Sequence, residues 1–132
     1  MPIFKLTESL SVAAQITPQD IPNLAEQGFT AVVCNRPDGE VPGQATMDEI
    51  EAACHAADLL FVRYPVDAMN FPGPDIEGLG ALFDDPGQSV LAYCRTGTRC
   101  ANLWVTSQTG EGQAEAVQLA REIGFDLSLV RA

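Results

Sequence analysis

The sequence predicts an α/β protein, a three-layer sandwich in which helices flank a mostly parallel central sheet. Three short apolar runs rich in β-branched residues are typical of buried strands, at 29–35, 59–65 and 89–93. Segments with helix-start and helix-stop signals separate these runs. Because a strand, a helix and a second strand in that order form a crossover between parallel strands, the alternation favours a parallel sheet.

Capping signals locate the helices between the strands. Thr17, followed by Pro18, predicts the start of a short helix, after a stretch that alternates loosely between apolar and polar residues. Thr46 and Glu49 have the spacing of a capping box and predict a second start. The predicted helices cover residues 18–28, 47–57, 75–85, 100–108 and 112–124.

Length and charge limit the classes of function. The 132 residues, 46% of them hydrophobic, suit a single domain over residues 1–132. Eighteen acidic against seven basic side chains give a net charge of -11, which repels phosphate backbones and anionic lipids. We therefore expect neither nucleic acid nor a membrane as partner. With no apolar run of roughly 20 residues and no signal-peptide pattern, the expected location is the cytoplasm.

The four cysteines are too few and too unevenly spaced for a disulfide scaffold, so we expect them to be reduced. The only histidine, His55, has one neighbouring cysteine, Cys54, and no further partner at ligand spacing. The sequence therefore predicts no metal site and no cofactor.

The stretch CRTGTR at 94–99 is the strongest chemical signal in the sequence. Cys94 directly follows the predicted strand 89–93, and ligands collect at the carboxyl ends of strands in parallel sheets. If the loop folds back on itself, its main-chain N–H groups converge on one point, where the positive end of the next helix adds to them. The residues expected to bind the anion are Arg95, Thr96, Gly97, Thr98 and Arg99.

The same electrostatic field favours a thiolate at Cys94. Such surroundings lower the pKa of a cysteine from about 8.5 to roughly 3.5 to 7.5. Arg99 carries a planar pair of donors suited to an oxyanion. An ionised Cys94 can attack phosphorus or sulfur while the loop amides hold the charge that develops.

Four stretches resemble a known family: AAQITPQDI, GFTAVVCNRPDGE, RYPV and LAYCRTGTRCANLW. They are similar to the protein tyrosine phosphatase superfamily, and more closely to the phosphatase-like domain of beta-lactamase-hydrolase-like proteins, a bacterial family. This resemblance implies a phosphatase-like fold, with Cys94 as nucleophile and Arg99 as anion binder. It leaves open whether the protein works alone or beside a metallo-hydrolase partner.

The sequence departs from the superfamily at three positions around the loop. Four residues separate Cys94 from Arg99, where the phosphatases have five. Tyr93 stands where a histidine usually precedes the nucleophile, and Cys100 stands where a hydroxyl residue often follows the arginine. The shorter loop resembles that of rhodanese-type sulfurtransferases, in which the cysteine carries a persulfide.

A phosphatase also needs a general acid for the leaving oxygen. Asp67, in the loop after RYPV, is the first candidate and Asp75 the second. The alternative for either residue is a solvated loop carboxylate. A sulfurtransferase would need no such acid.

Three further residues are candidates for support or redox roles. Arg36 either braces the active loop or belongs to a turn held by an ion pair. Cys34 or Cys100 could capture an oxidised or persulfidated Cys94 as a disulfide, or either could be an ordinary core cysteine.

Three hypotheses follow from the sequence, in this order. The first is a phosphatase-like hydrolase that cleaves a small phosphomonoester or a phosphoprotein through a Cys94 thiophosphate. The second is a sulfurtransferase that takes sulfur from a sulfane-sulfur donor as a Cys94 persulfide. The third is a non-catalytic module that binds an anion or a partner domain.

Overall fold

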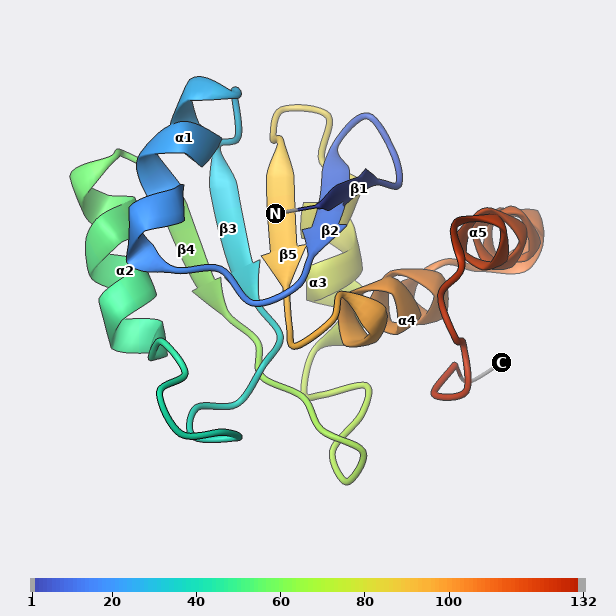
Figure 1. The fold of residues 1–132 in the computed structure, drawn as a ribbon. Coiled ribbons are helices and arrows are strands. Elements are labelled where there is room, and N and C mark those ends of the chain that lie inside the picture. The colour runs from blue at the N-terminus through green and yellow to red at the C-terminus, as the bar shows by residue number, and fades with distance from the viewer. Residues whose placement is uncertain (1, 131–132) are drawn as a thin grey trace.

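The computed structural model describes residues 2–130 and contains a five-stranded sheet flanked by helices (Figure 1). The strands are β1 (Ile3–Lys5), β2 (Leu10–Ala13), β3 (Ala31–Cys34), β4 (Leu60–Arg63) and β5 (Val90–Tyr93). The helices are a 3-10 turn η1 (Pro18–Asp20), α1 (Ile21–Glu26), α2 (Met47–Ala56), α3 (Ile76–Phe83), α4 (Thr98–Ser107) and α5 (Gly110–Ile123).

The strand order is β1-β2-β5-β3-β4, and only the edge strand β1 runs antiparallel to its neighbour. The predicted α/β class with a mostly parallel sheet is therefore confirmed. β5 lies in the centre between β2 and β3, and its last residue, Tyr93, is in register with Cys34, the last residue of β3. Cys94 therefore emerges from the middle of the carboxyl edge of the sheet.

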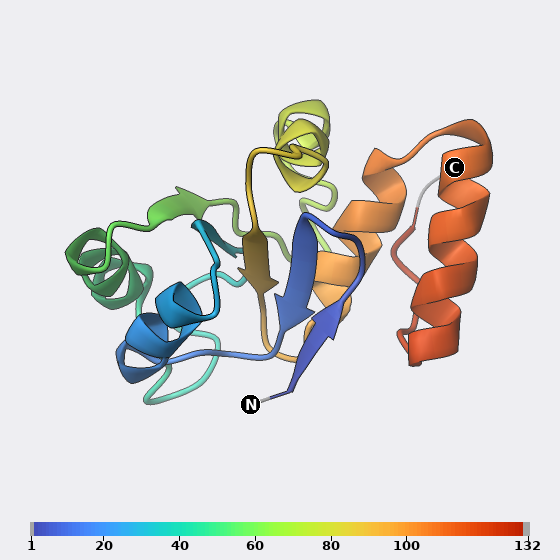
Figure 2. The ribbon, with the colours of Figure 1, turned by 90° about the horizontal axis from the view of Figure 1, so that it is seen from above.

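Helices pack on both faces of the sheet, as Figure 2 shows from above. One face buries Val32 and Leu91 against α1 and α2, and the other buries Val33 and Ala92 against α3 and α4. Because every residue of β2, β3 and β5 is buried, these strands have no polar face. The helix α5 packs on α4 and extends the second layer outward.

The sequence missed two strands and misplaced two helix starts. β1 has only three residues, none of them buried, and pairs on one side. β2 has only four residues, all of them buried, and the loose alternation of the stretch that contains it was too weak to predict a strand. α4 starts at Thr98 and α5 at Gly110, each two residues before the predicted start, so Arg99 lies in a helix rather than in a loop.

A buried amide joins the first turn of α4 to the segment after α5. The Asn102 side chain donates to the carbonyl oxygens of Thr98, at 2.8 Å, and of Asp126, at 2.7 Å. Its oxygen accepts from the Leu129 main-chain N–H at 3.1 Å. α4 is thereby tied to residues 126–129. In the part of the chain described, no helix is both long enough and apolar enough to cross a membrane.

Candidate active site

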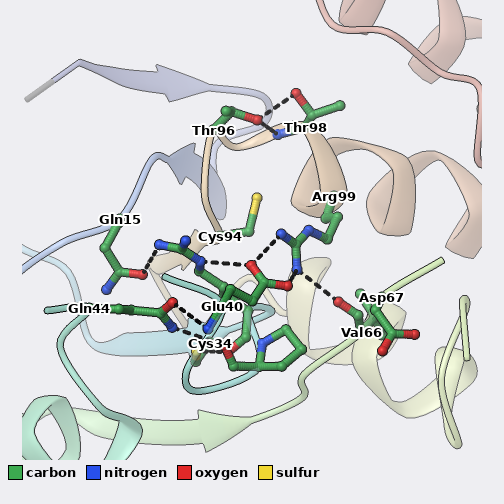
Figure 3. Close-up of polar contacts among 12 residues, drawn as sticks. Gln15, Cys34, Glu40, Gln44, Val66, Asp67, Cys94, Thr96, Thr98 and Arg99 are labelled. Atoms are coloured by element: carbon green, nitrogen blue, oxygen red, sulfur yellow. Dashed lines mark hydrogen bonds and ion pairs between the residues drawn. The ribbon is translucent and has the colours of Figure 1, made fainter. Parts of the chain in front are cut away.

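Three loops meet at the carboxyl edge of the parallel strands (Figure 1). They follow β3, β4 and β5, and cover residues 35–46, 64–75 and 94–97. Arg99, directly after the third loop in the first turn of α4, donates hydrogen bonds to the first two, and Figure 3 shows the side chains brought together here. The site predicted from the last of these loops is thus built by all three.

The loop after β5 turns its main chain back toward the Cys94 sulfur. The Gly97 N–H donates to Cys94 Sγ at 3.1 Å, and the Cys94 N–H donates to the Ala13 carbonyl at 3.3 Å, which ties the loop to β2. Gly97, the N-cap of α4, has φ +90, a conformation that glycine adopts without steric cost. This turn directs main-chain N–H groups at the sulfur.

The pKa of Cys94 is lowered to about 5, although its side chain is almost fully buried. The largest cause is a hydrogen bond from the Cys100 side chain, and it outweighs burial, which by itself raises the pKa of a thiol. Main-chain N–H groups of Cys100, Thr96 and Arg99 lower the pKa further. This shift favours the thiolate form of Cys94 at neutral pH.

Arg99 reaches from the first turn of α4 to the other two loops. Its Nη1 donates to Glu40 Oε2 at 2.9 Å and to the Val66 carbonyl at 3.0 Å, and its Nη2 donates to Glu40 Oε1 at 2.7 Å. Glu40 also accepts from Arg36 Nε at 2.8 Å, and Arg36 Nη1 donates to Gln15 Oε1 at 3.1 Å. One carboxylate therefore joins both guanidinium groups.

Glu40 is the site residue that sequence reasoning missed. Hydrogen bonds from Arg99 hold the pKa of its carboxyl below the ordinary value, with a further contribution from Arg36. The spacing of Arg36 and Glu40, four residues apart within NRPDGE, was the available signal. No local pattern links Glu40 to Arg99, because the two lie 59 positions apart.

Of the other residues predicted to bind the anion, the two threonines bond to each other and Arg95 is exposed. The Thr96 and Thr98 hydroxyls bond to each other at 2.9 Å, and Thr96 Oγ1 accepts from the Thr98 N–H at 3.4 Å. Figure 3 places this pair at the top of the loop. Arg95 is exposed and has no hydrogen-bond or ion-pair partner within residues 2–130.

The two candidate acids accept hydrogen bonds from their own turns. Asp67 Oδ1 accepts from the N–H groups of Met69, at 2.8 Å, and Asn70, at 3.0 Å. In Figure 3, Asp67 lies across the Arg99 guanidinium from Cys94. Asp75 caps α3 by accepting from the Gly78 N–H at 3.0 Å. Asp67 is thus beside the site, next in sequence to Val66, and Asp75 starts a helix.

The two candidate redox cysteines are both buried near Cys94. Cys100, in the first turn of α4, contacts the Cys94 sulfur, and burial raises its own pKa well above the ordinary value. Cys34 donates through its thiol to the Arg36 carbonyl at 3.2 Å, and burial raises its pKa. Within residues 2–130, no group of three or more His, Cys, Asp and Glu side chains is arranged to hold a metal ion.

The fold and this site define a phosphatase-like protein. Residues 3–111 match the family model described as "Beta-lactamase hydrolase-like protein, phosphatase-like domain". The chain therefore belongs to this family.

Curated relatives include the beta-lactamase hydrolase-like proteins of Agrobacterium fabrum, 30% identical, and of Xylella fastidiosa, 31% identical, each over 96% of this chain. The chain spans only 30% of the length of these relatives.

Solved structures with a similar fold include phosphatases. A "putative phosphatase" from Neisseria meningitidis is 35% identical, with a TM-score of 0.81 over 97% of this chain and 92% of that chain. PTPMT1 has a TM-score of 0.71 over 98% of this chain and 89% of its own, at 18% identity, and shows a shared fold alone. The predicted resemblance to a phosphatase-like family is thus confirmed.

Proposed function

We propose that the domain hydrolyses phosphomonoesters through a Cys94 thiolate. The observation that carries this proposal is the surroundings of the Cys94 sulfur: main-chain N–H groups donate to it, the Arg99 guanidinium lies beside it, and its pKa is lowered to about 5. A thiolate at neutral pH is a nucleophile, and main-chain N–H groups around it are donors suited to phosphoryl oxygens.

The reaction has two steps. The Cys94 thiolate attacks phosphorus, the phosphorus–oxygen bond to the leaving group breaks, and that oxygen takes a proton from an acid. Asp67 is our candidate acid, because it adjoins Val66, whose carbonyl binds Arg99. Water then attacks phosphorus, the sulfur–phosphorus bond breaks, and inorganic phosphate leaves with the thiolate restored.

Sulfur transfer is the second candidate, and the four-residue spacing between Cys94 and Arg99 favours it. The Asp67 carboxylate, bound by its own turn, favours it too, because this chemistry needs no acid. The thiolate would attack the outer sulfur of thiosulfate and release sulfite. Cyanide would then attack the outer sulfur of the persulfide and leave as thiocyanate.

Two parallel assays decide between these reactions. We expect the wild type to release nitrophenol from p-nitrophenyl phosphate and Cys94→Ser to release none. Thiocyanate from thiosulfate and cyanide without nitrophenol would replace the phosphatase by the sulfurtransferase. If neither product forms while inorganic phosphate still binds, the domain is an anion-binding module.

Asp67→Asn tests the acid. With p-nitrophenyl phosphate, whose leaving group needs little protonation, we expect a loss of less than about tenfold, and with a phenyl phosphate a loss of about a hundredfold. Equal losses with both substrates would contradict an acid role. Asp75→Asn is the matched control: because asparagine caps a helix about as well as aspartate does, we expect it to change neither thermal stability nor the ratio of the two rates.

Because the curated relatives extend well beyond the matched region, a metallo-hydrolase partner remains a proposal for this chain. Its test is co-purification of the domain with such a hydrolase.

A further inference from the structure

We propose that Glu40 is a positioning residue that holds Arg99 so that one edge of its guanidinium is presented to an oxyanion at Cys94. The proposal rests on the proposed anion site at Cys94. It adds a residue from a different loop, whose carboxylate accepts hydrogen bonds from Arg99 and Arg36.

The donors of Arg99 can be counted. A guanidinium carries five N–H groups: one on Nε and two on each Nη. Both Nη1 hydrogens are used, by Glu40 and the Val66 carbonyl, and one Nη2 hydrogen is used by Glu40. Among the described residues, the Nε–H and the second Nη2–H have no partner.

These two free donors lie side by side along one edge of the guanidinium. Two parallel N–H groups at this spacing match two oxygens of a phosphate, a sulfate or a carboxylate. In Figure 3, the Nη2 side of Arg99 lies nearer to Cys94, and the Nη1 side turns to Val66. The free edge therefore suits an anion seated over the thiol loop.

Glu40 can hold Arg99 because Glu40 is itself held. Its Oε1 accepts from Arg36 Nε at 2.8 Å, and the Arg36 side chain is only 4% exposed. Gln15 fixes the other end of Arg36. A long, mobile arginine side chain on α4 is thus restrained through a carboxylate that a buried arginine restrains in turn.

The same geometry gives Glu40 a structural role, since a buried Arg36 without a counter-ion is costly. A useful experiment must separate loss of folding from loss of Arg99 positioning. Glu51 offers a matched control, because its carboxylate pairs with Arg63 and its side chain is 34% exposed, against 26% for Glu40.

The experiment compares Glu40→Gln with Glu51→Gln. For Glu40→Gln we expect kcat/KM with p-nitrophenyl phosphate to fall about ten- to hundredfold, and inorganic phosphate to bind about tenfold more weakly. For Glu51→Gln we expect both quantities to stay within about twofold. A Glu40→Gln variant that retains both values would overturn the proposal.

Repeating Glu40→Gln in an Arg99→Ala background tests whether Glu40 acts through Arg99. We expect the second substitution to change phosphate binding by less than about twofold there, because the group that Glu40 positions is already absent. A full, additive loss would assign Glu40 a general structural effect and overturn the proposal. The proposal would also be overturned if Glu40→Gln shifted the pH dependence of Cys94 alkylation, because the substitution would then act on the Cys94 thiolate.

Two further measurements keep the test decisive. If Glu40→Gln does not fold, the double variant Arg36→Met/Glu40→Gln takes its place, because it removes the buried charge together with its partner. Its kcat/KM and phosphate binding are then compared with those of Glu51→Gln. If the wild type hydrolyses no phosphomonoester, the proposed function fails. Phosphate binding by the wild type and by Glu40→Gln still tests the positioning of Arg99.

Discussion

Cys34 and Cys94 lie side by side in the fold and differ in chemistry. Cys34 ends β3, Cys94 follows β5, and the exposed fractions of the two residues are 2% and 1%. Yet the pKa of Cys34 is raised by burial, while that of Cys94 is lowered to about 5. Two thiols that are almost equally buried therefore have pKa values shifted in opposite directions.

The balance between burial and hydrogen bonding makes the difference. After β5, the Gly97 N–H points at the sulfur and stabilises a negative charge there. At Cys34, burial raises the pKa more than hydrogen bonds with the Tyr93 side chain and the Arg36 main chain lower it. Hydrogen-bond donors thus outweigh burial at Cys94, and burial outweighs hydrogen bonding at Cys34.

The largest expected effect is on kcat, which should fall when Cys94 is replaced and not when Cys34 is replaced. Cys94→Ser should lower kcat by about a thousandfold or more, because a serine hydroxyl is not ionised at neutral pH. Cys34→Ala should keep kcat within about threefold and cost about 1 kcal/mol of stability. Steady-state kinetics and thermal unfolding measure both. Loss of turnover in a Cys34→Ala variant that still folds would contradict the proposal that only Cys94 of these two cysteines is needed for turnover.

Alkylation against pH compares the same two thiols within one molecule. Cys94 should react with iodoacetamide at rates that rise with a midpoint near pH 5. At about pH 7, Cys34 should react about a hundredfold more slowly, since its thiol is protonated there. Mass spectrometry of the peptides assigns the label. A Cys94 midpoint near about 8.5 would show an ordinary cysteine and remove the basis of the proposed chemistry.

Gly97→Ala should disturb the donor loop by a smaller amount. An L-residue at φ +90 is strained, so we expect a loss of about 1–2 kcal/mol in stability and about tenfold in kcat/KM as the N–H moves off the sulfur. Gly28→Ala, at φ +98 with nothing within 4 Å of an added Cβ, is the control. It should lose similar stability and no activity. Equal kinetics in both variants would rule out a special role for the Gly97 N–H.

The smallest effect comes from Cys100, the strongest single contributor to the lowered pKa of Cys94. Cys100→Ala removes the side-chain donor, so the pKa of Cys94 should rise and the acidic limb of the pH–rate profile should move to higher pH. Near pH 6 we expect a loss of about threefold, and none well above the new pKa. Cys100→Ser retains a donor and should keep the wild-type profile. A shift of the same size in both variants would contradict the hydrogen bond.

The sequence predicted the parts of this molecule that local patterns encode. The three apolar strands and the capping residues Thr17 and Thr46 indicated the parallel sheet, and the residues from Cys94 to Arg99 indicated the thiol loop. The edge strand β1 is too short to leave a periodic signal.

Long-range contacts account for what the sequence could not predict at the site. The contact between Arg99 and Glu40 joins two loops that only the sheet brings together. The turn that binds the Asp67 carboxylate depends on how the loop after β4 folds. Neither arrangement has a signature in neighbouring residues.

The amide of Asn102 has a mechanical consequence for the thiol loop. It bonds the Thr98 carbonyl, in the first turn of α4, to the main chain at residues 126 and 129. The first turn of α4, which supplies N–H donors to the sulfur, is thus held in place by residues 126–129, a segment distant in sequence. For the anion that we propose, the amides are already in place, so little of its binding energy would be consumed in ordering the loop.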